Sequence, residues 1–259
     1  MLEYITMGKM DLPWKVLIHG PPGAGKTTLA HTFPKPIFAD MEGSSERYDV
    51  DRIDLRDIPF EVIDPKTKDP IKDPSVSSVM NFVRTLASPK SEHQYKSLII
   101  DTLDWLEPKI WEHTCEKMGI ASMESLNYGK AYVEADKEYD QFLAGVNYLM
   151  HSKQMNIVVL AHTKTKVAQD KDMNEMQRHD IKLQNRAGAK FVEWAEVIGF
   201  LTYDTFLSKK NGKETAKHSG ERILIVQEDG QYVAKNRFGY QGEPIKPVNY
   251  EKMREKLYG

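Results

Sequence analysis

Short apolar runs bounded by turn-forming residues recur along the chain and predict buried β-strands. They lie at residues 15–19, 36–39, 97–100, 156–161 and 197–202. Between them, the helical spacing of apolar residues covers residues 26–33, 103–118 and 130–153. Because strands alternate with helices, the pattern predicts an α/β fold with a mostly parallel central sheet flanked by helices.

The C-terminal part follows a different pattern. Strand-like runs at residues 222–227 and 232–236 are separated by a turn that contains Asp229 and Gly230. An Asp-Gly pair between two such runs predicts a β-hairpin with a primed turn, which we expect at one edge of the sheet. Residues 248–258 then predict one short helix.

Two stretches show no regular period. Residues 49–74 are rich in Asp and Pro, which predicts an excursion on the surface. Residues 163–190 are polar and contain seven Lys or Arg and four Asp or Glu residues. A loop of this length in a compact domain is usually functional or disordered.

Composition narrows the class of protein. The 259 residues predict a single domain over residues 1–259, with its core at about 13–240 and a short tail at 241–259. Hydrophobic residues make up 40% and charged residues 29% of the chain, which excludes a disordered or membrane-embedded protein. The formal charge of the protein is −2, so a polyanion must bind to local basic patches. Cys115 is the only cysteine, so an internal disulfide is excluded, and the absence of a signal peptide favours the cytoplasm.

The segment GPPGAGKT at residues 20–27 matches the pattern G-x-x-x-x-G-K-[ST] of a phosphate-binding loop, between a predicted strand and a predicted helix. Its glycines let backbone N–H groups face the phosphates of ATP, and the Lys26 ammonium adds a positive charge. The Thr27 hydroxyl is expected to bind Mg²⁺. The predicted nucleotide-binding residues are Gly20, Pro21, Pro22, Gly23, Ala24, Gly25, Lys26, Thr27 and Thr28.

A second part of this site is predicted at Asp101. The run LIID places this carboxylate at the carboxyl end of a strand, where open α/β sheets bind ligands. Mg²⁺ needs a carboxylate opposite Thr27, so we interpret Asp101 as the Walker B acid. The alternative is that Asp101 caps the helix that begins near Leu103, and both roles are compatible.

Hydrolysis also needs a group that orients or deprotonates water. Asp40 and Glu42 follow the second predicted strand, which we expect beside the phosphate-loop strand, and Glu42 is the candidate base. The alternative for Glu42 is an ordinary solvated acid. His162, at the end of a later strand, is a candidate sensor of the γ-phosphate that passes its state to the following loop. The alternative is a structural histidine at a strand end.

The phosphate loop, the acidic residues after the second strand, Asp101 and His162 follow one another in an order that resembles the RecA-type P-loop NTPase core. The segment AKNRFG at residues 234–239 is similar to the KNRFG box that follows this core in bacterial RadA proteins. By that resemblance, Lys235 and Arg237 act in catalysis by reaching the phosphates of a neighbouring subunit, as an arginine finger does. A solvated Lys and Arg on a hairpin strand is the alternative.

From about residue 15 to 239, the chain resembles the small RecA-core ATPases of bacteriophages, the Sak-type single-strand-annealing or recombinase group. The shared segments are GPPGAGKT, FADMEG, SLIIDTLDWLEP, NYGKAY, VVLAHTK and AKNRFG. The resemblance implies an ATPase stimulated by single-stranded DNA that assembles into a ring or filament, with ATP between subunits. It also implies a single-strand-binding protein as a further partner, and the host cytoplasm as location.

In RecA-type proteins, two loops face the DNA, and here they correspond to residues 119–130 and 163–190. The basic residues of these loops would neutralise DNA phosphates when an oligomer repeats the loops along the strand. The predicted DNA-binding residues are Tyr128, Lys130, Lys164, Lys166, Lys171, Arg178, Lys182, Arg186 and Lys190. The alternative is a solvated charge run.

Two other functions use the same phosphate loop. A nucleotide or small-molecule kinase predicts a lid with several arginines, whereas residues 163–190 contain only Arg178 and Arg186. An AAA-type helicase loader predicts a helical lid after the core, and residues 243–259 are too few for one.

Overall fold

The computed structural model describes residues 12–169, 175–210 and 213–259. The strands are β1 (Lys15–Gly20), β2 (Pro36–Asp40), β3 (Asp51–Asp54), β4 (Ser97–Asp101), β5 (Asn156–Gln169), β6 (Glu175–Ile181), β7 (Val197–Lys210), β8 (Lys213–Ile225) and β9 (Lys235–Asn236). The α-helices are α1 (Lys26–His31), α2 (Val79–Ala87), α3 (Leu103–Met118), α4 (Lys130–Lys153), α5 (Asn185–Trp194) and α6 (Tyr250–Tyr258), with short 3-10 helices at Ser44–Arg47, Met123–Ser125 and Asn127–Gly129. The five strands predicted for the central sheet and the long helices are therefore confirmed.

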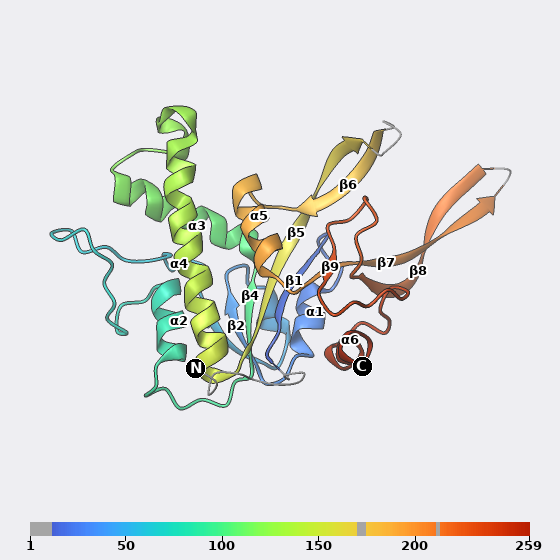
Figure 1. Ribbon diagram of the computed structural model, residues 1–259, viewed down its shortest axis with the longest axis horizontal. Helices are drawn as coiled ribbons and strands as arrows, with labels where there is room; N and C mark the ends of the chain where they lie inside the picture. Colours follow the sequence, from blue (N-terminus) through green and yellow to red (C-terminus); the bar gives the residue numbers. More distant parts are fainter. Residues whose placement is uncertain (1–11, 170–174, 211–212) are drawn as a thin grey trace, which may run out of the picture.

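The strands of this part of the chain form one sheet in the order β3-β2-β4-β5-β1-β7-β8, with β6 paired to β5 and β9 to β7. From β3 to β7 the neighbours are parallel, and β6, β8 and β9 pair antiparallel. Figure 1 shows helices on both sides of this sheet. The predicted α/β class, with a mostly parallel sheet flanked by helices, is confirmed.

One expectation about strand order is wrong. The phosphate-loop strand β1 pairs with β5 and β7, whereas the second strand, β2, pairs with β3 and β4. Each central strand contains a short apolar run, because parallel strands are buried on both faces. Their composition therefore does not encode which of them become neighbours.

Two hydrophobic clusters cover the two faces of the sheet. One packs α2, α3, α4 and α5 against the sheet, around side chains such as Phe142 and Phe191. The other packs α1 and α6 against the opposite face, with Trp14 and Met253 at its centre. The predicted short C-terminal helix is thus part of the core layer. Within the described residues, no helix combines the length and apolar character needed to cross a membrane.

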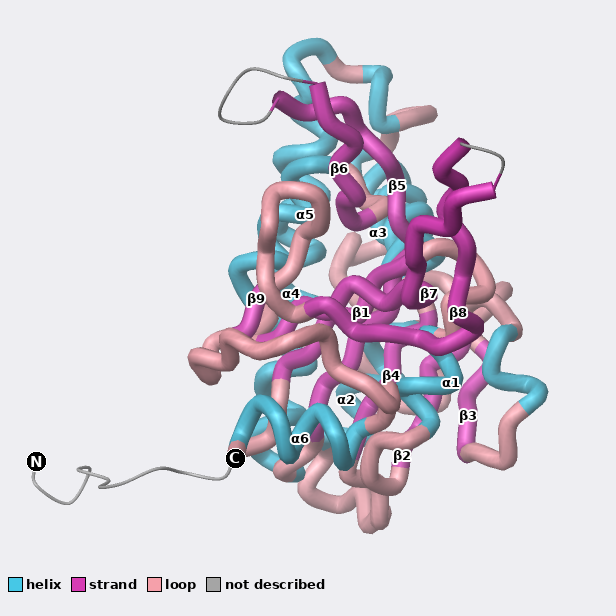
Figure 2. The backbone as a smooth tube through the Cα atoms, turned by 90° about the vertical axis from the view of Figure 1, so that its right-hand side faces the viewer, coloured by secondary structure: helices cyan, strands magenta, loops and turns pink. Residues whose placement is uncertain are grey.

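The long polar stretch at residues 163–190 was expected to be a loop, and this expectation is wrong for the part that the structure describes. Strand β5 continues beyond the sheet to Gln169 and pairs with β6, and α5 follows. Figures 1 and 2 show this hairpin and the β7–β8 hairpin projecting toward the same end of the molecule. Both faces of the β5 extension reach solvent, and Val167 is 72% exposed. The alternation of apolar and polar residues that identifies a half-buried strand is therefore absent.

The predicted hairpin around Asp229 and Gly230 is also wrong. Residues 222–225 belong to β8 and pair with β7, while β9 pairs with the start of β7 instead of with β8. A hairpin does extend the sheet edge, but it joins β7 to β8. The surface excursion at residues 49–74 also contains a regular element, the edge strand β3, which pairs with β2.

Candidate nucleotide-binding site

The carboxyl ends of the central strands bring the predicted site residues together. In the sheet register, Gly20 of β1 is opposite His162 of β5, and Asp40 of β2 is opposite Asp101 of β4. The open cavity at this edge has a volume of about 460 Å³. It is lined by Gly23, Gly25, Lys26, Thr27, Thr28, Glu42, Gly43, Ser44, Arg47, Tyr48, Asp101, His162 and Arg222.

The phosphate loop has the backbone conformation that its glycines permit. Gly23 and Gly25 have φ values of 77° and 97°, in the left-handed region that other residues rarely adopt. A Cβ atom at Gly20 would collide with the backbone oxygen of Leu201, so β1 and β7 approach closely only because this position is glycine. The sequence of the loop thus determines its shape directly.

Lys26 is held at the base of this loop. Its Nζ donates to the carbonyl oxygens of Gly20 at 3.2 Å and Pro21 at 3.3 Å, and the residue is buried. Burial lowers the pKa of Lys26, although the carboxylates of Glu42 and Asp101 oppose that shift. This ammonium has few solvent contacts and faces the cavity in which phosphates are expected.

Asp101 accepts two hydrogen bonds at its Oδ2 atom. The Thr27 hydroxyl donates at 3.0 Å and the Ser44 hydroxyl at 2.6 Å. The N-cap of α3 is Thr102, and Asp101 faces the cavity, so its capping role is not observed. Two hydroxyls and a carboxylate are the hard oxygen donors that Mg²⁺ prefers, so this donor set fits the ion.

Burial raises the pKa of Asp101 to about 6, and the bonds from Ser44 and Thr27 only partly oppose this shift. Nearby carboxylates, Asp40 and Glu42, also disfavour its ionised form. A cation bound beside Asp101 would relieve both effects.

Asp40 organises the turn after β2. Its Oδ1 accepts from the backbone N–H groups of Glu42 at 3.0 Å and Gly43 at 2.6 Å. Its Oδ2 accepts from the backbone N–H and the hydroxyl of Ser45. Burial would raise the pKa of Asp40, but these donors hold it below its usual value. The turn therefore presents Glu42 and Ser44 to the cavity. The contribution of Ser44 was not predicted, because a serine in a turn has no distinctive signal.

Glu42, His162 and Asp104 form a chain of polar contacts at the cavity edge. The Nε2 atom of His162 lies 3.8 Å from Oε1 of Glu42, and its Nδ1 lies 2.8 Å from Oδ2 of Asp104. Asp104 also accepts from the backbone N–H of His162 at 2.9 Å. The base and sensor candidates thus lie side by side, and Asp104 in α3 was not predicted.

Arg222 is a third residue that the sequence did not indicate. It is in β8 and lies against the phosphate loop, where a Cβ atom on Gly25 would be 2.8 Å from its Cζ atom. Its Nε atom is buried and has no hydrogen-bond partner in residues 12–169, 175–210 and 213–259, and its guanidinium lies 5.9 Å from the ring centre of Tyr203. Tyr203 in turn donates to the carbonyl of Gly23 at 3.2 Å. An arginine from this chain therefore lines the phosphate cavity.

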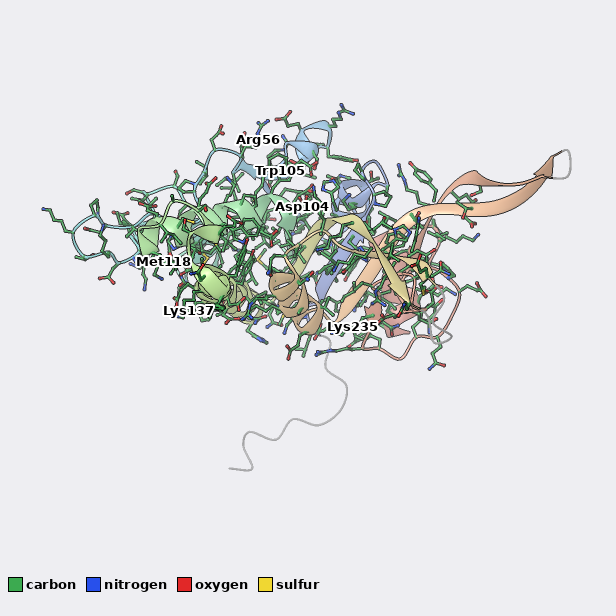
Figure 3. All side chains as sticks on the ribbon, turned by 90° about the horizontal axis from the view of Figure 1, so that it is seen from above. Arg56, Asp104, Trp105, Met118, Lys137 and Lys235 are labelled. Atoms are coloured by element: carbon green, nitrogen blue, oxygen red, sulfur yellow. The ribbon has the colours of Figure 1, made fainter. Side chains whose placement is uncertain are left out.

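Lys235 and Arg237 lie elsewhere. Strand β9 pairs with the first residues of β7, at the amino end of the sheet, opposite the phosphate loop. The Nζ of Lys235 donates to Val192 O at 2.7 Å, and Arg237 donates to Glu193 O at 3.0 Å, so both bind carbonyls at the end of α5. Seen from above, Lys235 and Asp104 lie on different sides of the molecule (Figure 3). Lys235 and Arg237 therefore do not reach the nucleotide cavity of their own chain.

Most residues predicted to bind DNA have partners within the chain. Five cations pair with carboxylates: Lys166–Asp180, Arg178–Glu228, Lys182–Asp104, Arg186–Asp136 and Lys190–Asp140. Lys164 donates to the carbonyl of Leu183. Lys171 lies outside the described residues. Tyr128, in the turn before α4, is 97% exposed, and Lys130 at the start of α4 is exposed.

Comparisons with known proteins find a matching family model and similar solved structures. The model of the AAA domain family (AAA_24) matches residues 12–238. No curated protein matches the chain. Among solved structures, it is similar to the flagellar accessory protein FlaH from Methanocaldococcus jannaschii, with 10% identity, a TM-score of 0.36 and coverage of 82% of this chain and 85% of FlaH. It is also similar to the RadB recombinase, with 12% identity, a TM-score of 0.42 and coverage of 90% and 86%.

Proposed function

The chain belongs to the AAA domain family, and from this premise we propose that it hydrolyses ATP with Mg²⁺ and couples hydrolysis to binding of single-stranded DNA. The contact that carries the proposal is the bond from Thr27 to Asp101, because it joins the phosphate loop to the acid of β4. We further propose that residues 1–259 act as one ATPase domain in the cytoplasm.

The roles within the site follow from its geometry. The loop amides and Lys26 bind the β- and γ-phosphates, and Thr27 and Asp101 hold Mg²⁺, with Ser44 orienting the carboxylate. When bound, Mg²⁺ supplies positive charge to the phosphate oxygens. Glu42, which lines the cavity on the turn formed by Asp40, accepts the proton of the attacking water.

Arg222 is proposed to stabilise charge on the transferred phosphate. Its buried Nε has no partner within the described part of the chain, although leaving such a donor unpaired costs about 1–3 kcal/mol. A phosphate oxygen in the cavity would provide the acceptor. This arginine acts within one chain, whereas Lys235 and Arg237 act only if an oligomer brings them to a neighbour's nucleotide and α5 releases them.

Coupling to DNA is proposed to run through His162. Its backbone and ring are bonded to Asp104, and β5 continues directly from His162 into the projecting hairpin. A change at the γ-phosphate that moves Glu42 would therefore act at the base of this hairpin. Both hairpins project from the edge that holds the nucleotide cavity, which supports this surface as the DNA-binding face (Figure 2).

DNA phosphates would compete with the carboxylates that now pair with the cations near the hairpin base. The side chain of Lys182 is 60% exposed, and its Nζ lies 3.8 Å from Asp104. Lys182 is therefore the cation that connects this surface to Asp104 and its partner His162. We propose that single-stranded DNA recruits Lys182 and repeats such contacts along an oligomer, with a single-strand-binding protein as a further partner.

The decisive experiment measures ATP hydrolysis with and without single-stranded DNA over a salt series. We expect stimulation by DNA, and log affinity for DNA that falls with log salt by about 0.7 per phosphate neutralised. The Lys26→Ala variant should hydrolyse no ATP. Hydrolysis without DNA stimulation would retain the ATPase and remove the DNA assignment, and absence of nucleotide binding would remove both.

The two residues proposed to act on a neighbouring subunit's nucleotide, Lys235 and Arg237, need a separate test. Lys235→Ala and Arg237→Ala should retain ATP binding but lower DNA-stimulated turnover if they act in an oligomer. Equal loss of binding and turnover would instead assign them to the packing of α5 on β9.

A further inference from the structure

A buried cluster of ionisable side chains lies outside the nucleotide site, in the helical layer that contains α3 and α4. It contains Glu61, in the segment between β3 and α2, His113 of α3 and Glu138 of α4. One ligand atom from each residue lies within 4.8 Å of the other two, and all three residues are buried. These residues are far apart in sequence, so only the tertiary structure brings them together.

The imidazole of His113 is the unexplained part of this cluster. Its side chain is 2% exposed, and neither Nδ1 nor Nε2 has a hydrogen-bond partner among the residues that the structure describes. The Nε2 atom lies 3.5 Å from Oε2 of Glu138 and 3.9 Å from Oε2 of Glu61. A charged imidazole bonded to a carboxylate lies at about 2.7–2.9 Å, so the three groups face one another across a gap.

The spacing of the three groups approaches that of ligands around a metal ion. Around a tetrahedral Zn²⁺, ligand atoms at about 2.0–2.2 Å from the metal lie roughly 3.4 Å from one another. The separation of 3.5 Å between His113 and Glu138 is close to this value, and that of 3.9 Å between His113 and Glu61 is longer. Oε2 of Glu138 also has no hydrogen-bond partner in the described structure, so two of the three inward atoms are available to a ligand.

The outer oxygens of both carboxylates are already held. Lys117 donates to Oε1 of Glu138 at 2.8 Å, and Arg84 donates to Oε1 of Glu61. The inward Oε2 of Glu61, unlike that of Glu138, also accepts a bond, from Gln141 at 3.1 Å. Supporting bonds of this kind orient carboxylate ligands in metal sites. The side chains of Lys117 and Arg84 are 44% and 27% exposed, so solvent screens their charges. The inward ligand atoms are less accessible to solvent than these two cations.

We propose that Glu61, His113 and Glu138 bind a divalent transition-metal ion, for which Zn²⁺ is the probe. One nitrogen and two oxygen ligands suit such an ion better than Mg²⁺, which prefers oxygen alone. The ion cross-links α3, α4 and the segment between β3 and α2, and its role is structural. This site is independent of the proposed ATPase function.

The test uses the whole protein without nucleotide. After chelation and dialysis, the wild type is incubated with Zn²⁺, passed through a desalting column and its zinc content measured. We expect one bound Zn²⁺ per chain and a raised midpoint of thermal unfolding. Glu138→Gln and His113→Gln should lose the ion, whereas Glu134→Gln, a change at a half-exposed position of α4, should keep it.

Asp101→Asn separates this site from the nucleotide site, because it removes the Walker B carboxylate and should leave the zinc content unchanged. Replacement of Zn²⁺ by Co²⁺ in the wild type should give visible absorption bands of a nitrogen- and oxygen-ligated ion, a readout that does not depend on whether the variants fold. Absence of zinc uptake by the wild type, or uptake that both cluster variants retain, would overturn the proposal.

Discussion

The ring Nδ1 of His162 lies 2.8 Å from Oδ2 of Asp104, and the backbone N–H of the same histidine donates to Oδ1 at 2.9 Å. Burial alone would raise the pKa of Asp104, but these two bonds hold it below its usual value. The carboxylate is therefore ionised and accepts from both groups, which places the ring proton on Nδ1. The end of β5 is thus attached to the first turn of α3, beside the nucleotide cavity.

Replacing Asp104 with Asn should weaken this attachment while the phosphate loop remains intact. We expect ATP affinity to change less than about threefold and the stimulation of hydrolysis by single-stranded DNA to fall about tenfold, because a neutral acceptor forms weaker bonds. Steady-state hydrolysis with and without DNA measures both effects. The exposed change Asp57→Asn is the control, and unchanged stimulation in Asp104→Asn would contradict the coupling route.

Asp101→Asn should stabilise the nucleotide-free protein at neutral pH. The folded pKa of about 6 lies above the unfolded value of 3.8, so the folded state binds more protons and wild-type stability falls as pH rises from about 4 to 6. The variant lacks this loss and should be about 2–3 kcal/mol more stable at pH 8. Urea unfolding at pH 5 and 8 tests this difference. A variant less stable than the wild type at pH 8 would contradict it.

The affinity for Mg²⁺–ATP should depend on the same group. Below pH 6, Asp101 becomes protonated and cannot ligate Mg²⁺, so affinity should fall by up to about tenfold per pH unit. Titration of a fluorescent ATP analogue between pH 5 and 8 measures this. The same titration with EDTA in place of Mg²⁺ corrects for protonation of the nucleotide, and an identical pH profile in the two series would exclude Asp101 as the cause.

Glu42→Gln should separate binding from hydrolysis. The amide fits the same turn, since Asp40 bonds to the backbone there and not to the Glu42 side chain. Loss of a general base typically costs about 100-fold or more in rate, so hydrolysis should fall by at least that factor while ATP binding persists. Glu46→Gln, at an exposed position in the next turn, should hydrolyse ATP normally. Retained hydrolysis in Glu42→Gln would leave Glu42 as a solvated acid.

Arg222→Ala should lower hydrolysis about 100-fold, with a smaller effect on ATP binding, because the guanidinium lies against the phosphate loop. Arg222→Lys keeps the charge but loses the planar fork and should recover only part of the rate. Single-turnover kinetics at saturating ATP give the rate directly. An Arg222→Ala enzyme as fast as the wild type would show that its role is limited to packing on Tyr203.

Much of the nucleotide site could be predicted because its signals are local in the sequence. The phosphate loop requires glycine at particular backbone angles and a lysine and threonine directly after them, all within eight residues. Asp101 follows an apolar run that can only be a buried parallel strand. The alternation of such runs with helices likewise predicts the α/β class.

Strand order, the two hairpins and the remaining site residues were decided by tertiary structure. The contact of Ser44 with Asp101 joins residues 57 positions apart, and Arg222 reaches the phosphate loop from a strand near the other end of the chain. Neither residue has a pattern that marks it. The extension of β5 has no buried face, so no apolar period identifies it as a strand.

The sequence by itself therefore determined what depends on neighbouring residues: the loop that binds phosphate, the buried strands and the long helices. Tertiary structure alone decided which strands are adjacent and which carboxylates neutralise the cations of residues 164–190. The physical reason is that a backbone conformation is encoded within a few residues. A contact between distant side chains depends on the packing of the whole sheet and its two helical layers.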